Sequence, residues 1–232
     1  VFERGDELGR GGANAADLAL HFPIPRLSEV GDEIADGLWD YDEERPRPLA
    51  LFDAVRVDFS LRRLVHYTGT DWRAVQPWIL LTNYHRYVDQ FIRRGVAMLK
   101  KDTIYDRLVL PGGISLDAQT SEEELEAIFR ASPWQRFQMP AYHLTTKDGQ
   151  GVTLVNIGVG PANAKNITDH LAVLRPHAWL MVGHCGGLRQ SQRIGDYVLA
   201  HAYLREDGIL DSTIPTEVPI PALAEMQVAL QE

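Results

Sequence analysis

The sequence is short of cysteine, basic charge and long apolar runs. Its 232 residues contain one cysteine, Cys185, which excludes an intrachain disulfide framework and predicts a reducing, cytoplasmic location. No run of about 18 apolar residues occurs, so the sequence predicts no membrane-spanning helix. The 23 basic and 32 acidic residues give a net charge of −9, which argues against nucleic acid or an anionic membrane as a partner.

Motifs for metal and nucleophile chemistry are also missing. The eight histidines never lie four residues apart and C-x-x-C is absent, so no metal site is predicted. The G-x-S-x-G of hydrolases, the full G-x-G-x-x-G spacing and the G-K-[ST] of a P-loop are absent as well. The run Glu122 to Glu124 is interpreted as the solvated first turn of a helix rather than a catalytic carboxylate pair.

What the chain does contain is the pattern of an α/β fold. Hydrophobic residues make up 45% of it, enough for a core. From residue 77 onward, short apolar runs alternate with segments of helical periodicity, which predicts a mostly parallel sheet. Expected strands are 78–81, 108–110, 142–146, 152–157, 178–182 and 197–203; expected helices are 53–67, 84–99, 121–129, 161–174 and 221–230. Asp148-Gly149 predicts a β-hairpin between the third and fourth strands.

The first candidate site is the glycine turn from Asn156 to Ala162. A strand ends there, Gly158 and Gly160 turn the chain, and Pro161 opens a helix. Glycines allow close approach of a ligand to the backbone, and a helix N-terminus attracts phosphate. The alternative is a tight strand–helix turn that binds nothing.

Two further candidates follow expected strands, where ligands bind in open α/β sheets. Arg86 lies just after the first strand and could bind an anion with its planar guanidinium, or could simply be solvated. His184 follows the 178–182 strand and could donate to a phosphate or hydroxyl, or could bond to the backbone instead. Cys185 is interpreted as a small packing residue, because no cationic cluster is evident that would activate its thiol.

The three turns belong to a longer set of specific stretches. These are GDEIADG at 31–37, RVDFSL at 56–61, HYTGT at 66–70, TNYHRYVD at 82–89, GQGVTLVNIGVGP at 149–161, GHCGGL at 183–188 and IGDYVLAH at 194–201. Together they run through almost the whole chain. In their order and spacing they resemble the AMP nucleosidases, which hydrolyse AMP to adenine and ribose 5-phosphate.

The catalytic half of that family is similar to purine nucleoside phosphorylases and nucleosidases, which implies a mixed sheet flanked by helices. The resemblance implies that Arg86 binds phosphate. It places Gly158, Val159 and Gly160 beside the ribose. A second arginine of the group, offered across a dimer interface, falls near Arg136.

The segment Gly183 to Gly186 falls where this group lines the ribose, the phosphate and the base, which makes His184, Cys185 and Gly186 candidate contacts. The group usually has Thr or Ser where this chain has His184. We infer that His184 meets the phosphate side of a nucleotide rather than free phosphate.

The resemblance implies that catalytic groups lie elsewhere. The group's acid is an Asp in a Ser-Asp motif, and a Glu in a Met-Glu motif holds the ribose; both belong beyond residue 232, and neither motif occurs here. We therefore expect residues 1–75 to be the end of an N-terminal regulatory domain with its linker, and 76–232 to be the first half of the catalytic domain. The isolated chain is expected to be inactive.

The resemblance also implies the partners. They are AMP and water as substrates, phosphate as an inhibitor, MgATP as an allosteric activator, and further copies in a homo-oligomer, expected to be a hexamer. No cofactor is expected for the chemistry. The alternatives left open are a purine nucleoside phosphorylase, a nucleotide-binding fragment without turnover, and an α/β domain with another use.

Overall fold

The computed structural model describes residues 57–209, 211 and 214–231. The sequence before Val57, which holds the GDEIADG stretch and the start of the predicted 53–67 helix, lies outside them. The chain divides into two compact units, one ending at Met181 and the other running from Val182 to Glu232. The predicted domain boundary at residue 75 stays a prediction.

The first unit contains a six-stranded sheet in the order β3-β2-β4-β5-β1-β6. Its strands are β1 (Trp78–Thr82), β2 (Tyr105–Leu110), β3 (Ile114–Leu116), β4 (Ala141–Thr146), β5 (Val152–Asn156) and β6 (Ala178–Met181). β1 lies between β5 and β6 and is parallel to both, whereas β5–β4, β4–β2 and β2–β3 are antiparallel. The implied mixed sheet is confirmed, and the expectation of a mostly parallel sheet is wrong.

Two of the three antiparallel pairings in the sheet are hairpins. The predicted β4–β5 hairpin is present, with Ala141 opposite Val155. The second hairpin, β2–β3, was not expected: Leu110 pairs with Ile114 across a turn in which Gly112 and Gly113 have φ of 85° and 81°. Glycines adopt such angles without the steric cost that other residues pay. The Gly-Gly pair therefore reverses the chain where the sequence suggested only a strand end.

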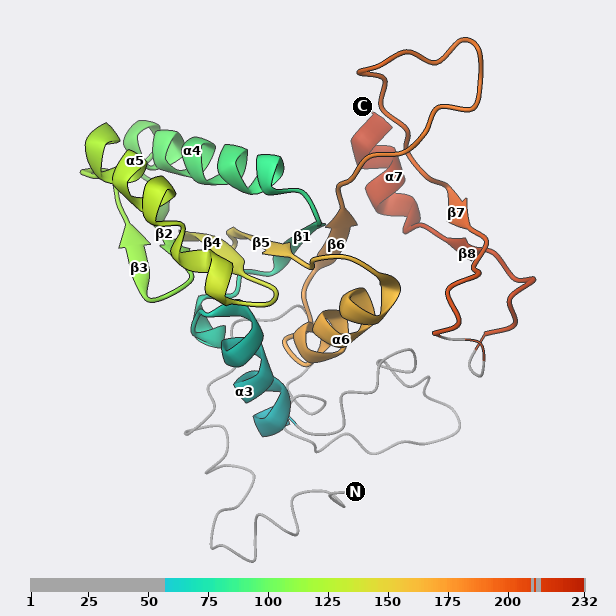
Figure 1. Cartoon of the computed structure of the whole chain (residues 1–232), viewed down its shortest axis with the longest axis horizontal. Helices are drawn as coiled ribbons and strands as arrows, with labels where there is room; N and C mark the ends of the chain where they lie inside the picture. Colours follow the sequence, from blue (N-terminus) through green and yellow to red (C-terminus); the bar gives the residue numbers. More distant parts are fainter. Residues whose placement is uncertain (1–56, 210, 212–213, 232) are drawn as a thin grey trace, which may run out of the picture. The chain divides into compact units, whose positions relative to one another are not determined.

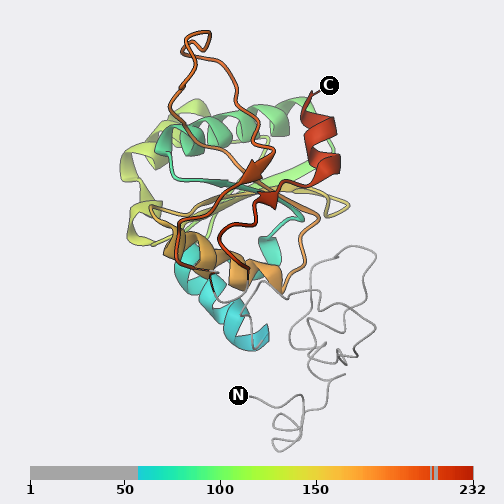
Figure 2. The same cartoon turned by 90° about the vertical axis from the view of Figure 1, so that its right-hand side faces the viewer.

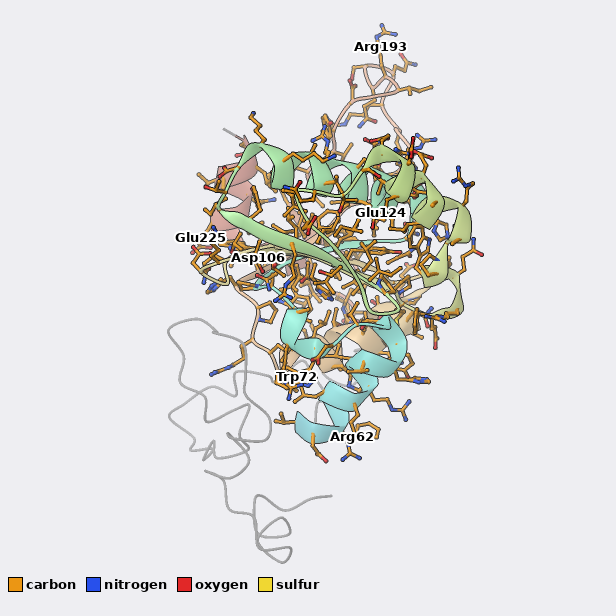
Figure 3. The ribbon with its side chains drawn as sticks, turned by 90° about the vertical axis from the view of Figure 1, so that its left-hand side faces the viewer. Arg62, Trp72, Asp106, Glu124, Arg193 and Glu225 are labelled. Carbon is orange, nitrogen blue, oxygen red and sulfur yellow. The ribbon has the colours of Figure 1, made fainter. Side chains whose placement is uncertain are left out.

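Helices cover both faces of this sheet. They are α3 (Val57–Thr68), α4 (His85–Lys101), α5 (Glu122–Ala131) and α6 (Pro161–Ala172), with the short 3₁₀ helices η1 (Trp72–Ala74) and η2 (Pro133–Arg136). Figures 1 and 2 show α4 and α5 on one face and α3 and α6 on the other. In Figure 3, Arg62 of α3 and Glu124 of α5 accordingly lie on opposite sides of the sheet. The helices predicted over these ranges are confirmed within the described residues.

The helices form because their apolar residues recur on one face. In α4, Val88, Ile92, Val96 and Leu99 are all buried, a spacing that aligns side chains on one side of a helix. At the start of α5, the hydroxyl of Ser121 accepts a hydrogen bond from the Glu124 N–H at 3.1 Å. The three glutamates that follow the cap complement the positive end of the helix dipole.

Each face of the sheet carries its own apolar core. The core on the α3 and α6 side includes Leu61, Leu64, Ile79, Leu81, Ile167 and Leu171. The core on the α4 and α5 side includes Val88, Ile92, Val96, Leu108, Leu125 and Leu154. The HYTGT stretch contributes Tyr67 to the first of these cores, so the end of α3 is an integral part of the sheet domain.

The second unit holds less regular structure. It contains β7 (Ala202–Tyr203), paired antiparallel with β8 (Ile220–Pro221), and α7 (Ala224–Gln231). The predicted helix at 221–230 is confirmed with a later start. The predicted strand 197–203 is wrong except for its last two residues, and Tyr197 is fully exposed. None of the helices in the described ranges is long and apolar enough to cross a membrane.

Candidate functional site

The carboxyl ends of β1 and β5 form one edge of the sheet in the first unit. Thr82 lies opposite Asn156, the last residue of each strand. The register is extended by a hydrogen bond of 2.8 Å from the Ile157 N–H to the Thr82 carbonyl. Because the two strands are parallel, the turns that follow them lie at the same edge. The structure therefore brings together the predicted sites at Arg86 and at the glycine turn.

The glycine turn is held by its own backbone and by Asn156. The Oδ1 atom of this buried asparagine accepts a hydrogen bond from the Gly158 N–H at 3.1 Å. Gly158 and Gly160 have φ of 67° and 98°, and Gly160 is the N-cap of α6, with Pro161 at its first position. The side chain of Val159 is 81% exposed. The turn thus presents backbone to solvent at the positive end of a helix.

Arg86 follows the short turn that joins the end of β1 to α4. The hydroxyl of Thr82 accepts a hydrogen bond from the Tyr84 N–H at 3.2 Å, which fixes the turn before α4. Arg86 is the second residue of that helix and is exposed. The first turns of α4 and α6 therefore begin at the same sheet edge, where helix dipoles and a guanidinium all favour an anion.

Arg136 lies in η2, just before β4. Since β4 is antiparallel to β5 and its first residue pairs with Val155, the chain enters β4 at the same edge at which β5 ends. The Arg136 guanidinium lies 5.1 Å from the centre of the Phe137 ring. It also lies against Gly112, where an added Cβ would come within 2.7 Å of its Nη2 atom. Arg136 thus occupies the same edge as the other two predicted sites in this unit.

The remaining predicted residues belong to the second unit. His184, Cys185 and Gly186 lie in a segment without helix or strand, directly after its first two residues. All three are exposed, and Cys185 is a free thiol. Their predicted roles remain predictions.

Two histidines of the first unit are enclosed in ways the sequence analysis missed. Burial lowers the pKa of His143 on β4 to about 3, although the charge of Asp71 opposes this. Burial also lowers the pKa of His170 on α6; the charge of Asp169 opposes this shift and that of Arg63 adds to it. Local sequence gave one usable signal: His143 lies between Tyr142 and Leu144 in an expected strand, where a buried polar side chain must find partners.

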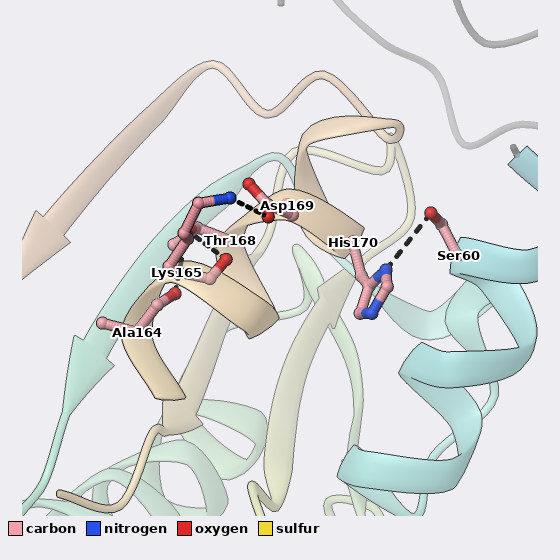
Figure 4. Close-up of polar contacts among 6 residues, drawn as sticks. All are labelled: Ser60, Ala164, Lys165, Thr168, Asp169 and His170. Carbon is pink, nitrogen blue, oxygen red and sulfur yellow. Dashed lines mark hydrogen bonds and ion pairs between the residues drawn. The ribbon is translucent and has the colours of Figure 1, made fainter. Parts of the chain in front are cut away.

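His170 connects α6 to α3. Its Nδ1 atom lies 3.2 Å from the Ser60 hydroxyl (Figure 4). Its ring also stacks on that of Tyr67. Within α6, the Nζ atom of Lys165 and the Oδ2 atom of Asp169 form an ion pair of 2.7 Å. These contacts fix the helix whose N-terminus carries the glycine turn. Among the residues that the structure describes, no group of His, Cys, Asp or Glu has the arrangement of a metal site.

Comparison with known proteins adds three findings. Residues 118–231 match the Phosphorylase superfamily. AMP nucleosidases from two strains of Escherichia coli are 56% identical to the chain over 229 residues, which is 98% of this chain and 46% of theirs. The crystal structure of AMP nucleosidase from Bacteroides thetaiotaomicron is similar with a TM-score of 0.53 at 26% identity, over 75% of this chain and 60% of that chain. The chain spans about half the length of the curated relatives it matches.

Proposed function

Because residues 118–231 match the Phosphorylase superfamily and the chain is 56% identical to AMP nucleosidase over 98% of its length, we propose that it forms part of an AMP nucleosidase. The reaction is hydrolysis of the N-glycosidic bond of AMP to adenine and ribose 5-phosphate. The single observation that carries the proposal for this site is the shared sheet edge, where Arg86 and the N-terminus of α6 lie after paired parallel strands.

The proposed roles of the first unit follow from its geometry. Arg86 and the first turn of α6 hold the 5′-phosphate, since both supply donors to an anion. The turn Gly158-Val159-Gly160 lies beside the ribose, because a backbone without side chains at two positions permits close contact. Arg136, at the same edge, is proposed as a second phosphate ligand or as a residue offered to a neighbouring subunit.

The resemblance to AMP nucleosidases supports proposed roles for three residues of the second unit. His184 contacts the phosphate side, and Cys185 and Gly186 line the sugar and base. No local charge activates the thiol in this proposal, so Cys185 acts by its small size. The nucleotide is recognised by neutral and cationic donors, which is compatible with a chain of net charge −9 because only the local field matters.

The reaction also requires a proton donor for adenine and a group that holds the ribose. Breaking the C–N bond builds positive charge on the ribose ring, as in other glycoside cleavages. Water adds to the anomeric carbon and loses a proton, while the departing adenine gains one. We propose that an Asp beyond residue 232 protonates the base and a Glu beyond it holds the ribose hydroxyls, while the present residues fix the phosphate.

Regulation and assembly are proposed from the same homology. They comprise a cytoplasmic homo-oligomer, expected to be a hexamer, activated by MgATP and inhibited by phosphate. No cofactor takes part in the proposed chemistry. Residues 1–75 would then belong to the end of the regulatory domain.

The proposal is tested with a chimera in which this chain replaces the matching 229 residues of the Escherichia coli AMP nucleosidase. We expect adenine and ribose 5-phosphate to form from AMP without added phosphate, and added phosphate to slow the reaction rather than to support it. Product that forms only with phosphate, as ribose 1,5-bisphosphate, would instead indicate a phosphorylase. A chimera that binds AMP without releasing adenine would refute catalysis.

The isolated chain serves as the matched control. We expect it to release no adenine, because the proposed acid lies outside it. Turnover by the isolated chain would show that the catalytic acid lies among its own residues, and would overturn that part of the assignment.

A further inference from the structure

The Tyr67–Thr70 turn, at the end of the HYTGT stretch, is bonded to two distant segments of the first unit. The carbonyl of Gly69 accepts a hydrogen bond of 2.9 Å from the Gly112 N–H, in the β2–β3 turn. The carbonyl of Tyr67 accepts one of 3.0 Å from the Met139 N–H, just before β4. The turn therefore fixes the two segments between which Arg136 lies.

Gly69 also leaves room for the ring beneath Arg136. Its φ is 71°, and an added Cβ would lie 2.5 Å from the ring of Phe137. The Arg136 guanidinium lies over the Phe137 ring, 5.1 Å from the ring centre. On another side, the guanidinium rests on Gly112, where a Cβ would collide with it. Two glycines and one aromatic ring thus define a seat for this arginine, which we call the Arg136 seat.

A series of buried hydrogen bonds connects this turn to β4 and β5. The hydroxyl of Thr70 lies 2.8 Å from Nε2 of His143, whose Nδ1 lies 2.8 Å from the hydroxyl of Thr153. The Thr70 hydroxyl also lies 2.9 Å from that of Thr68. These groups are buried, so each depends on protein partners for its hydrogen bonds.

The direction of every bond in this series is set by its two ends. At one end, the Gln76 N–H can only donate, and it bonds to the Thr153 hydroxyl at 2.7 Å. At the other, the Leu64 carbonyl can only accept, and it takes the proton of the Thr68 hydroxyl at 2.7 Å. Thr70 must then donate to Thr68, and its remaining lone pair accepts from His143.

It follows that His143 carries its proton on Nε2. Thr153 accepts from the backbone of Gln76 and donates to Nδ1, so that each hydroxyl in the series donates once. The opposite tautomer would turn the Thr70 hydroxyl proton toward His143 and break its bond to Thr68. A doubly protonated ring would leave the hydroxyl proton of Thr153 without an acceptor.

We propose that His143, as the neutral Nε2–H tautomer, positions the Thr68–Thr70 turn and thereby the Arg136 seat. His143 is a positioning residue, since it lies inside the sheet domain and acts on Arg136 only through Thr70, Gly69 and Phe137. The inference rests on the proposed function only in treating Arg136 as a phosphate ligand. The placement of its guanidinium is a property of the chain itself.

The test is nuclear magnetic resonance of the full 232-residue chain labelled with ¹⁵N. Spectra of the histidine rings should show Nε2 protonated and Nδ1 bare for His143, without titration between about pH 5 and 8, the range in which an ordinary histidine changes charge. Relaxation of the Arg136 Nε–H should show an ordered side chain. An Nδ1–H tautomer, a titrating His143 or a freely moving Arg136 would each overturn the proposal.

Three variants test the contact at Thr70, the contact at Gly112 and a control position. Thr70→Val keeps the side-chain shape and should lose both the single tautomer and the order of Arg136. Gly112→Ala should displace Arg136 and leave the His143 tautomer unchanged. The matched control is Thr145→Val, which removes a hydroxyl of β4 that bonds to the Arg107 carbonyl at 3.1 Å, and it should change neither signal.

An ordered Arg136 in Thr70→Val would refute the link from the turn to the seat. If Thr70→Val does not fold, the wild-type tautomer and Gly112→Ala still decide the outcome. None of these signals needs AMP. An ordered seat in a chimera that does not cleave AMP would therefore contradict the proposed function alone, and a disordered seat in an active chimera would contradict this inference alone.

Discussion

At the scale of single residues, the glycine turn combines two different backbone requirements. Gly158 has a φ of 67°, close to the left-handed helical region that other residues enter at modest cost. Gly160 has φ 98° and ψ 154°, a conformation almost restricted to glycine. The second position therefore explains why this turn cannot be made from other residues.

Gly160→Ala should lower the free energy of unfolding by about 1–3 kcal/mol, the cost of a strained backbone conformation. Gly158→Ala is the matched comparison and should cost about 1 kcal/mol, although its Cβ would lie 3.2 Å from the Asn163 amide. Urea unfolding of both variants measures the difference. Equal stability of Gly160→Ala and wild type would show that the turn is not strained.

The buried His143 should make stability depend on pH. Its pKa falls from an ordinary value near 6.5 to about 3 in the folded chain, so the unfolded chain binds a proton first as the pH falls. The stability is thus fully present above about pH 6.5 and declines toward pH 3. Within that window the slope from this one group reaches about 1.4 kcal/mol per pH unit.

His143→Gln replaces the imidazole by an amide, which still offers a donor and an acceptor but does not titrate. Its unfolding free energy, measured from pH 4 to 7, should therefore decline less steeply toward acid than that of the wild type. The difference between the two curves isolates this histidine from the other titrating groups. Parallel curves would contradict the assignment.

At the scale of elements, α6 packs against both the sheet and α3. Ile167 and Leu171 of α6 and Leu64 of α3 are fully buried in the same core. The contact between Ser60 and His170 joins the helices at their polar side. Because α6 begins at Gly160, these contacts determine where its N-terminus lies.

Leu64→Ala should destabilise the first unit by about 2–5 kcal/mol, the loss of burial plus the cavity that remains. Leu188→Ala is the control, since that side chain is 97% exposed, and should change stability by less than about 0.5 kcal/mol. Thermal and urea unfolding provide the measurement. A cost below 1 kcal/mol for Leu64→Ala would mean that α3 does not pack as described.

The elements also show what sequence patterns can and cannot predict. The helical spacing of Val88, Ile92 and Val96 is local, so α4 was predictable, and so was the β4–β5 hairpin. The β2–β3 pairing was missed because a Gly-Gly pair indicates a turn but does not indicate which strand the following residues pair with. The 197–203 run failed as a strand because a strand needs a partner, and only Ala202 and Tyr203 have one.

At the scale of the whole molecule, the same distinction applies to the site. Strand-end turns predicted Arg86 and Gly158 to Gly160, and parallel pairing placed them at one edge. The hydrogen bonds through His143, and with them the Arg136 seat, could not be predicted, because two of these bonds join residues 73 and 77 positions apart. No local period encodes such contacts.

The two units should differ in local stability. The first contains both apolar cores, whereas α7 buries no residue and β7 and β8 have two residues each. Amide hydrogen exchange followed by mass spectrometry should therefore show slow exchange in β1, β4 and β5 and fast exchange across the segment 183–200 and in α7. Equal protection in both units would contradict this difference.

The most direct measurement of the central claim compares AMP with adenosine in the chimera, before and after Arg86→Ala. If Arg86 holds the 5′-phosphate, the variant should lose about 10–100-fold in kcat/KM for AMP, the worth of a charge-assisted hydrogen bond. Any cleavage of adenosine, which has no phosphate, should be unchanged, and Arg62→Ala on the far side of α3 should alter neither. An unchanged kcat/KM for AMP, or equal losses for AMP and adenosine, would contradict the account.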